Sequence, residues 1–236
     1  MIKVITSKTF IWVTIFSIAM GFLETAVVVY ARALYFPNGF QFPLVPINEL
    51  IALTELWREI ATIVMLIGVG TLAGTTRPSK FAYFIYSFAI WDIFYYVFLK
   101  LILDWPTSLL TWDLLFLVPV TWVGPVLSPL IVAFTMVTFS ILILVKNNKL
   151  TCPSITLLTT SAFMLILSFS WDYGTYVFES PDSRELWSFG LNGDLFASVA
   201  NYTPTSFNWF LFGIGEALFI ASVLFYSSNS KKTTHE

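Results

Sequence analysis

The sequence predicts an all-α integral membrane protein with six transmembrane helices, and three observations lead to this fold class. Hydrophobic residues make up 57% of the 236 residues, whereas charged residues make up only 11%. A soluble globular domain usually carries about 25% charged residues, so this chain cannot cover itself with a water-soluble surface. The mean hydropathy is +0.81. Six separate segments also reach the roughly 20 apolar residues that a helix needs to cross a bilayer.

The six predicted spans follow one another along the chain and leave no length for a separate soluble domain, so we interpret residues 1–236 as a single polytopic domain. The first span begins like a signal peptide, because Lys3 and Lys8 precede an apolar run. That run continues through Glu24 to Val29 without a small-residue cleavage site, so we interpret it as a retained helix. The predicted spans are about 9–33, 50–72, 81–103, 123–145, 155–178 and 206–227.

The distribution of basic residues predicts the orientation of these helices. Eight of the 12 Lys and Arg residues lie in the N-terminal segment, the second loop, the fourth loop or the C-terminal segment, which all share one side of a six-span arrangement. Of the acidic residues, only Glu236 lies on that side. The positive-inside rule then places both termini in the cytoplasm, with the protein in the cell membrane. The eight basic residues are Lys3, Lys8, Arg77, Lys80, Lys146, Lys149, Lys231 and Lys232.

The connections on the predicted outer side are long and aromatic, whereas those on the cytoplasmic side are short and polar. The first outer connection, 36–48, contains three prolines, and the third loop, 104–125, contains three tryptophans. Within the third loop, segment 107–118 is interpreted as a re-entrant segment or an interfacial helix, because apolar segments of about 10–14 residues rarely span a membrane. Long loops often carry binding and catalytic residues, so we expect any site to open outward.

A short motif recurs in helices that are predicted to run from the cytoplasm to the outside. Trp91-Asp92 is followed by Tyr96-Val97-Phe98, and 80 residues later Trp171-Asp172 is followed by Tyr176-Val177-Phe178. The first span holds a degenerate copy that begins at Leu23-Glu24. This spacing predicts three helical hairpins related by an axis near the membrane normal, as in transporters built from parallel repeats. Chance recurrence in an aromatic-rich chain is the alternative.

Ionisable residues inside the predicted spans are the main indication of function. Each costs at least about 2.5–3.5 kcal/mol near the bilayer centre on insertion scales, so each is a functional hypothesis by default. Glu55, Arg58 and Glu59 are spaced i, i+3 and i+4, which puts all three on one helix face. Acids outnumber bases, and buried unpaired carboxylates take up a proton or bind a cation. The candidate ligand- or ion-binding residues are Glu24, Glu55, Arg58, Glu59, Asp92, Tyr96, Asp172, Tyr176 and Glu216.

Each of these candidates also has a structural interpretation. Arg58 and a neighbouring glutamate would form a buried ion pair that sets helix packing. Asp92 and Asp172 would hydrogen-bond to tyrosines or to nearby backbone groups. Glu216 follows two glycines, which allow close helix approach, so it would form a packing hydrogen bond.

The residue types exclude several kinds of chemistry. The sequence has one histidine, His235, which removes histidine-ligated haem, the usual zinc and copper sites, His-box di-iron centres and Ser-His-Asp hydrolysis. It contains no P-loop, and a net charge of −2 argues against nucleic-acid binding. Cys152 is the single cysteine and forms no internal disulfide. We expect no cofactor and no resident metal, and any metal bound would be a hard cation held by oxygen.

Three functions stay open on the sequence. The first is a proton- or cation-coupled transporter or channel with an outward-facing carboxylate and aromatic cavity, which acids in five of the six spans favour. The second is a membrane enzyme that acts on a lipid-like substrate at the outer leaflet, with Asp104, Asp113 and Asp182 as candidates beside Asp92 and Glu59. The third is a non-catalytic subunit of a larger membrane complex. The expected partners are the lipid bilayer, a proton, small cation or apolar small molecule, and either a second copy or a membrane complex.

Overall fold

The structure of the protein is a computed structural model that describes residues 2–45, 48–117, 121–179 and 202–229. Within these ranges the chain forms seven helices and one two-stranded sheet. The elements are α1 Ile2–Ile5, α2 Lys8–Tyr35, α3 Glu49–Ala73, α4 Arg77–Leu103, β1 Trp112–Phe116, β2 Trp122–Pro125, α5 Leu127–Lys146, α6 Cys152–Glu179 and α9 Trp209–Asn229.

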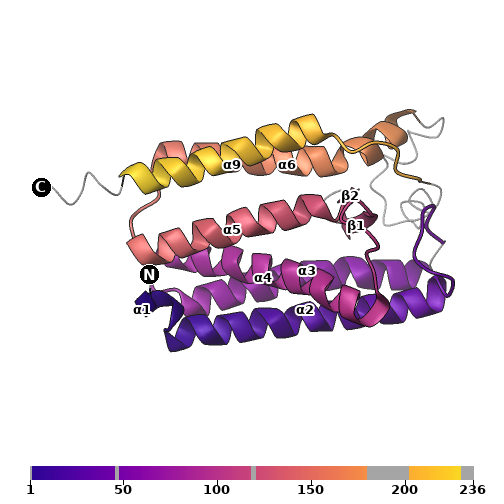
Figure 1. Ribbon diagram of the computed structural model, residues 1–236, viewed down its shortest axis with the longest axis horizontal. Helices are drawn as coiled ribbons and strands as arrows, with labels where there is room; N and C mark the ends of the chain where they lie inside the picture. The colour runs from indigo at the N-terminus through magenta and orange to yellow at the C-terminus, as the bar shows by residue number, and fades with distance from the viewer. Residues whose placement is uncertain (1, 46–47, 118–120, 180–201, 230–236) are drawn as a thin grey trace, which may run out of the picture.

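The six long helices lie side by side along the long axis of the molecule, and successive helices run in opposite directions (Figure 1). Helix α1 and the beginnings of α2, α4 and α6 lie at one end of the bundle, which we call the terminal end. The β1–β2 hairpin lies towards the other end, the hairpin end (Figure 1). The segments that carry most basic residues therefore do share one end, as the charge distribution predicts. Their cytoplasmic location stays a prediction.

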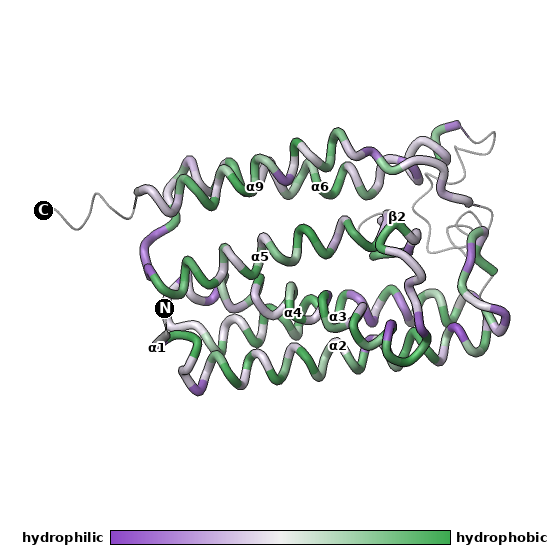
Figure 2. The backbone as a smooth tube through the Cα atoms, in the orientation of Figure 1, coloured by the Kyte–Doolittle hydropathy of each residue, from purple (hydrophilic) through white to green (hydrophobic). Residues whose placement is uncertain are grey.

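Among the described residues, five helices are long and apolar enough to cross a membrane: α2, α4, α5, α6 and α9. Hydrophobic residues predominate along the bundle (Figure 2), and large apolar side chains such as Leu34, Phe163 and Phe210 are exposed on its outside. Such a surface fits a lipid environment rather than water. The remaining predicted span, 50–72, is helical as part of α3, but α3 is not among the five. Six spans are therefore not confirmed.

Local sequence signals explain where several helices begin and end. Ser7 accepts a hydrogen bond from the Phe10 backbone N–H at 3.2 Å, which caps α2. Thr76 and Ser79 form a capping box at the start of α4. Asn147 ends α5 in the left-handed region, with φ 49°, a conformation that asparagine tolerates better than most residues.

Helices α2 and α3 both pack closely against α4. A Cβ atom on Gly21 of α2 would lie 3.0 Å from the Trp91 carbonyl oxygen, and one on Gly70 of α3 would lie 2.7 Å from the Lys80 carbonyl oxygen. Glycine at these positions therefore permits both approaches. Helices α2 and α3 make few contacts with each other.

The predicted repeat of three hairpins is not confirmed. Helices α6 and α9 pack along their length, with the Ser222 hydroxyl donating to the Ser154 carbonyl oxygen at 2.9 Å, whereas α2 and α3 barely touch. The two Trp-Asp pairs also differ in their surroundings, because Trp91 is only 7% exposed and Trp171 is 44% exposed.

The third loop, 104–125, differs from its sequence interpretation. The described part of segment 107–118, which ends at Leu117, does not form a short helix, because β1 pairs with β2 in an antiparallel hairpin whose register places Leu114 opposite Val123. The backbone groups of this apolar segment are thus paired between strands instead of within a helix. The fold is therefore mostly helical rather than all-α, and α5 begins at Leu127 instead of residue 123.

The hairpin inserts between the helices, as a re-entrant segment would. The Trp122 ring stacks on the Phe169 ring, with centroids 5.8 Å apart and an interplanar angle of 9°. Phe169 lies well within α6 rather than at its end. The hairpin consequently contributes its own side chains to the interior of the bundle.

Candidate functional site

A cavity of about 290 Å³ lies between α2, α3, α4, α5, α6 and the hairpin, with residues of the 36–45 segment also in its wall. Its lining is mostly apolar, and ten of the lining residues are aromatic. They include Phe88, Trp91, Tyr95, Phe116, Trp122 and Phe169. A concave, largely apolar space with a few polar groups is the usual form of a small-molecule site.

The charged lining of the cavity is predominantly acidic. Four carboxylates and one guanidinium line it: Glu24, Glu55, Glu59, Asp92 and Arg58. These side chains come from α2, α3 and α4. The structure thus brings together residues that are as much as 68 positions apart in the sequence.

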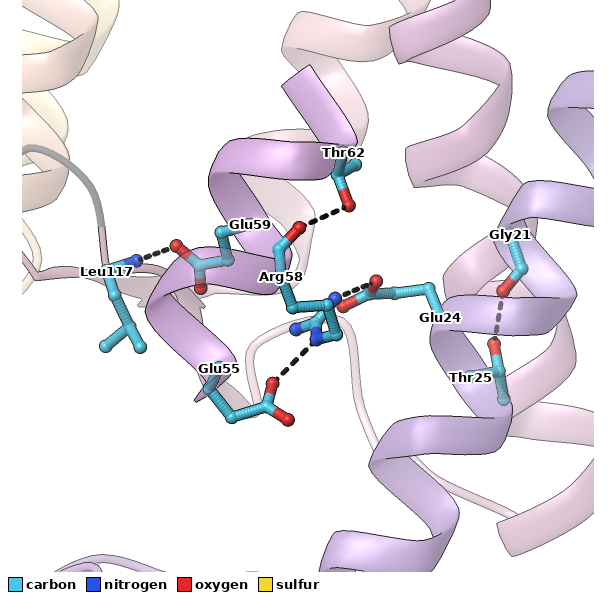
Figure 3. A network of polar contacts seen from close by, with 8 residues as sticks. All are labelled: Gly21, Glu24, Thr25, Glu55, Arg58, Glu59, Thr62 and Leu117. Atoms are coloured by element: carbon cyan, nitrogen blue, oxygen red, sulfur yellow. Dashed lines mark hydrogen bonds and ion pairs between the residues drawn. The ribbon is translucent and has the colours of Figure 1, made fainter. Parts of the chain in front are cut away.

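Arg58 joins α3 to α2 across one wall of the cavity (Figure 3). Its Nε donates a hydrogen bond to Glu55 Oε2 at 2.7 Å, and its Nη1 donates to Glu24 Oε2. The Thr62 hydroxyl donates to the Arg58 carbonyl oxygen at 3.0 Å. One guanidinium therefore serves two carboxylates, and this agrees with the structural interpretation of Arg58.

Glu59 points away from Arg58, towards the hairpin (Figure 3). It is buried, and its Oε2 accepts a hydrogen bond from the Leu117 backbone N–H at 2.9 Å. Leu117 directly follows β1. The carboxylate thus connects α3 to the hairpin, and no cation among the described residues forms an ion pair with it.

Asp92 lines the cavity without a hydrogen bond or ion pair to any described residue. Trp91, its neighbour in the chain, also lines the cavity, and the Trp91 Nε1–H has no acceptor within the part of the chain described. Tyr96 lies one helical turn after Asp92, on the same face of α4. Asp92 is therefore the cavity carboxylate that has neither a hydrogen-bond donor nor a cation beside it among the described residues.

A second charged cluster adjoins the cavity through Tyr96. The Tyr96 hydroxyl donates to Asp113 Oδ2 at 3.1 Å, and Arg32 Nη2 lies 3.8 Å from Asp113 Oδ1. The Arg32 guanidinium carbon lies 3.9 Å from the Trp105 ring centroid and 4.5 Å from that of Phe40. Burial raises the pKa of Asp113 to about 6, although Arg32 and the Tyr96 hydrogen bond lower it. Sequence reasoning did not place Arg32, Phe40 or Trp105 in a site.

Asp172 and Tyr176 are not part of the cavity lining. Asp172 accepts hydrogen bonds from the Tyr202 hydroxyl at 2.5 Å, from the Thr205 backbone N–H at 3.0 Å and from the Thr205 hydroxyl at 2.7 Å. The Ser206 backbone N–H adds a fourth bond at 3.1 Å. Burial and the bond to Asp172 raise the pKa of Tyr202. Tyr176 contacts the Tyr202 ring, so these residues hold the segment that leads into α9.

Glu216 lies on α9 and is also absent from the cavity lining. Its Oε1 accepts a hydrogen bond from the Thr135 hydroxyl of α5, whereas its buried Oε2 has no partner among the described residues. This bond between helices matches the packing interpretation of Glu216.

Six of the nine candidates from the sequence thus line one cavity, namely Glu24, Glu55, Arg58, Glu59, Asp92 and Tyr96. Of the other acids considered for an enzyme, Asp104 is exposed and pairs with Lys100 at 2.6 Å, and Asp182 lies outside the described residues. In the part of the chain that the structure describes, no group of three or more His, Cys, Asp or Glu side chains is arranged to hold a metal ion.

No family model matches the chain, and comparisons with characterised proteins and with solved structures give no match either. The class of the protein is therefore inferred from its own sequence and fold. Several long apolar helices surround a partly acidic cavity, and this arrangement fits a multi-pass membrane protein.

Proposed function

We propose that the protein is a proton- or cation-coupled transporter or channel of the cell membrane, with Asp92 as the central binding residue. The observation that carries the proposal is the excess of carboxylates over cations in one cavity. The proposal includes six transmembrane helices with both termini in the cytoplasm, so that the hairpin end faces outward.

The charge balance of the cavity supports uptake of a proton or cation. Arg58 is already shared between Glu24 and Glu55. Glu59 has a backbone N–H as its partner, and Asp92 has no partner among the described residues. Burying an ionised carboxylate in apolar surroundings costs free energy unless the carboxylate is paired. Binding of a proton or a cation from outside the chain would remove this free-energy cost at Asp92, and release of the proton or cation would restore the cost.

Helix α3 is treated as the sixth span. Its 25 residues correspond to a length of about 37 Å at 1.5 Å per residue, which exceeds the roughly 30 Å hydrocarbon core. It lies alongside α2 and α4 in the bundle (Figure 1). Glu55, Arg58 and Glu59 of α3 line the cavity, and charged residues in membrane helices usually face the bundle interior or a cavity.

Proton flux into proteoliposomes tests the proposal directly. Purified full-length protein is reconstituted with an internal pH dye, and an inward proton gradient is applied with potassium and valinomycin to balance charge. We expect dye acidification that exceeds that of empty vesicles and is at least tenfold slower with Asp92→Asn. Asp104→Asn is the matched control, because Asp104 is exposed and outside the cavity, and it should retain the wild-type rate. Flux equal to that of empty vesicles, with protons and with Na⁺ or K⁺ gradients, would refute the proposal.

The apolar lining favours a second candidate, a membrane enzyme for a lipid-like substrate. In that mechanism Asp92 and Glu59 would act as general base and general acid on one bound molecule. Mass spectrometry of lipids extracted from purified protein distinguishes the two. A lipid that copurifies with wild type, disappears in the apolar wall variant Phe88→Ala and is chemically converted on incubation supports the enzyme; intact bulk lipid alone argues against it.

A further inference from the structure

We propose that the ligand of the cavity is an organic ammonium ion that also carries an acceptor oxygen. This inference rests on the proposed function, because it names the class of cation that the same cavity would bind.

The size and lining of the cavity favour an organic ion over a bare metal ion. A space of about 290 Å³ with mostly apolar walls suits a ligand with an apolar body. Hard cations such as Mg²⁺ and Ca²⁺ require six to eight oxygen ligands. Within the described ranges, no cluster of three or more acidic, histidine or cysteine side chains is arranged for a metal. An ammonium group needs fewer oxygens, because its carbon substituents contact the apolar wall.

The cavity combines a carboxylate with aromatic side chains, which together recognise ammonium groups. Asp92 supplies a negative charge with no partner in the described chain, and Trp91, Tyr95 and Phe88 line the same cavity. Aromatic faces attract cations through the ring quadrupole, and aromatic cages around quaternary ammonium ligands are the best-known use of this attraction.

The same combination of a carboxylate and aromatic rings surrounds Arg32, a cationic side chain of the protein itself. The Arg32 guanidinium lies against the rings of Trp105 and Phe40 while Asp113 supplies the negative charge, at distances of 3.9, 4.5 and 3.8 Å respectively. Tyr96 belongs both to that cluster and to the cavity wall. The cavity offers the same two kinds of group, but its one arginine is occupied by Glu24 and Glu55.

The indole N–H of Trp91 favours a ligand that carries an acceptor oxygen. It is 7% exposed, and its Nε1–H has no acceptor in the part of the chain described, although the residue lines the cavity. A buried donor without a partner costs about 1–3 kcal/mol, and a hydroxyl, ether or carbonyl oxygen on the ligand would satisfy it.

Binding of a charged probe and its neutral isostere tests this inference without any transport measurement. Purified full-length protein in neutral detergent is titrated with choline phenyl ether and with 3,3-dimethylbutyl phenyl ether, in which carbon replaces the ammonium nitrogen. Calorimetry and tryptophan fluorescence report binding. We expect the cation to bind at least tenfold more tightly, Asp92→Asn to remove this preference, and Asp104→Asn to keep it. Trp91→Phe should weaken both ether probes several-fold, because it removes the indole N–H that donates to the ether oxygen, and the cation should remain the preferred probe.

Equal affinity for the two probes in folded wild-type protein would overturn the inference, as would an unchanged preference in Asp92→Asn. If Asp92→Asn does not fold, Asp92→Glu takes its place, because it retains the charge and should reduce the preference by displacing it. The experiments distinguish failure of the proposed transport function from failure of this inference. Absence of flux of protons, Na⁺, K⁺ and the choline ether itself into proteoliposomes, with intact cation binding, refutes the transporter, whereas flux without a charge preference refutes only the organic cation.

Discussion

The Tyr96 hydroxyl donates a hydrogen bond to Asp113 Oδ2 at 3.1 Å, which joins the α4 wall of the cavity to the first strand of the hairpin. Arg32 of α2 lies 3.8 Å from the other oxygen of the same carboxylate. One buried aspartate thus connects three elements around the cavity. Its loss should disturb the cavity even though Asp113 is not part of the lining.

Replacing Tyr96 by phenylalanine should destabilise the protein while preserving the ring. The change removes a hydrogen bond to a buried charged group, which is worth about 1.5–3 kcal/mol. The free energy of unfolding in mixed micelles should fall by that amount. Tyr30→Phe is the control, since Tyr30 is 65% exposed and should change little. Equal effects of the two substitutions would contradict the role of the Tyr96–Asp113 bond.

The contribution of Asp113 to the free energy of unfolding should decrease as the pH rises. Burial raises its pKa to about 6 in the fold from 3.8, so the folded state holds this proton more tightly than the unfolded state. The contribution is therefore fully present below pH 3.8 and is lost as the pH rises through 6. Between about pH 4 and pH 6.5, the unfolding midpoint of the wild type should fall more steeply than that of Asp113→Asn, which does not titrate. Asp104→Asn should parallel the wild type; parallel curves for Asp113→Asn as well would refute this assignment.

The ion pair between Arg58 and Glu24 should couple α2 to α3. Arg58→Met leaves two carboxylates without their cation, whereas Arg58→Met combined with Glu24→Gln leaves only one. A double-mutant cycle on the free energy of unfolding should give a coupling of about 0.5–3 kcal/mol, the usual range for residues in direct contact. A matched cycle of Arg58→Met with Asp104→Asn should be additive. Additivity in both cycles would mean that the pair does not stabilise the helix contact.

Glu59 should hold the hairpin against α3 through the Leu117 backbone N–H. Glu59→Leu removes the acceptor, so amide hydrogen exchange at Leu117 and in β1 should become faster. Glu59→Gln keeps a carbonyl oxygen and should have a smaller effect. Trp57→Leu is the control on the same helix, because Trp57 is exposed. Unchanged exchange in Glu59→Leu would show that the hairpin is held by its other contacts.

Asp172 should prove to be a structural residue. Asp172→Asn places an amide donor among four donors, so the protein should lose about 1.5–3 kcal/mol of stability, with faster hydrogen exchange at 202–206. Tyr202→Phe removes one of the four bonds and should have a weaker effect of the same kind. Cation binding by the folded Asp172→Asn protein should equal that of the wild type. Loss of binding without loss of stability would return Asp172 to the list of binding residues.

The sequence alone determined the class of the protein and the approximate positions of its long helices. Helix α4, predicted at 81–103, extends over Arg77–Leu103, and α6, predicted at 155–178, extends over Cys152–Glu179. These positions are predictable because the length of an apolar run is a local property that the bilayer thickness selects. The structure of the third loop, 104–125, was not predictable, because a short apolar segment fits a strand or a helix equally well.

Only the tertiary structure decided which ionisable residues share a site. A helix that is apolar on all sides carries little information about its rotation, so the sequence treated Asp92 and Asp172 alike. In the fold, Asp92 lines the cavity without a partner among the described residues, whereas Asp172 accepts four hydrogen bonds from the segment before α9. The Trp-Asp motif is the same in both helices. The difference arises because the neighbours of a side chain are set by helix packing and by the distant hairpin, which the residues next to it in the sequence do not specify.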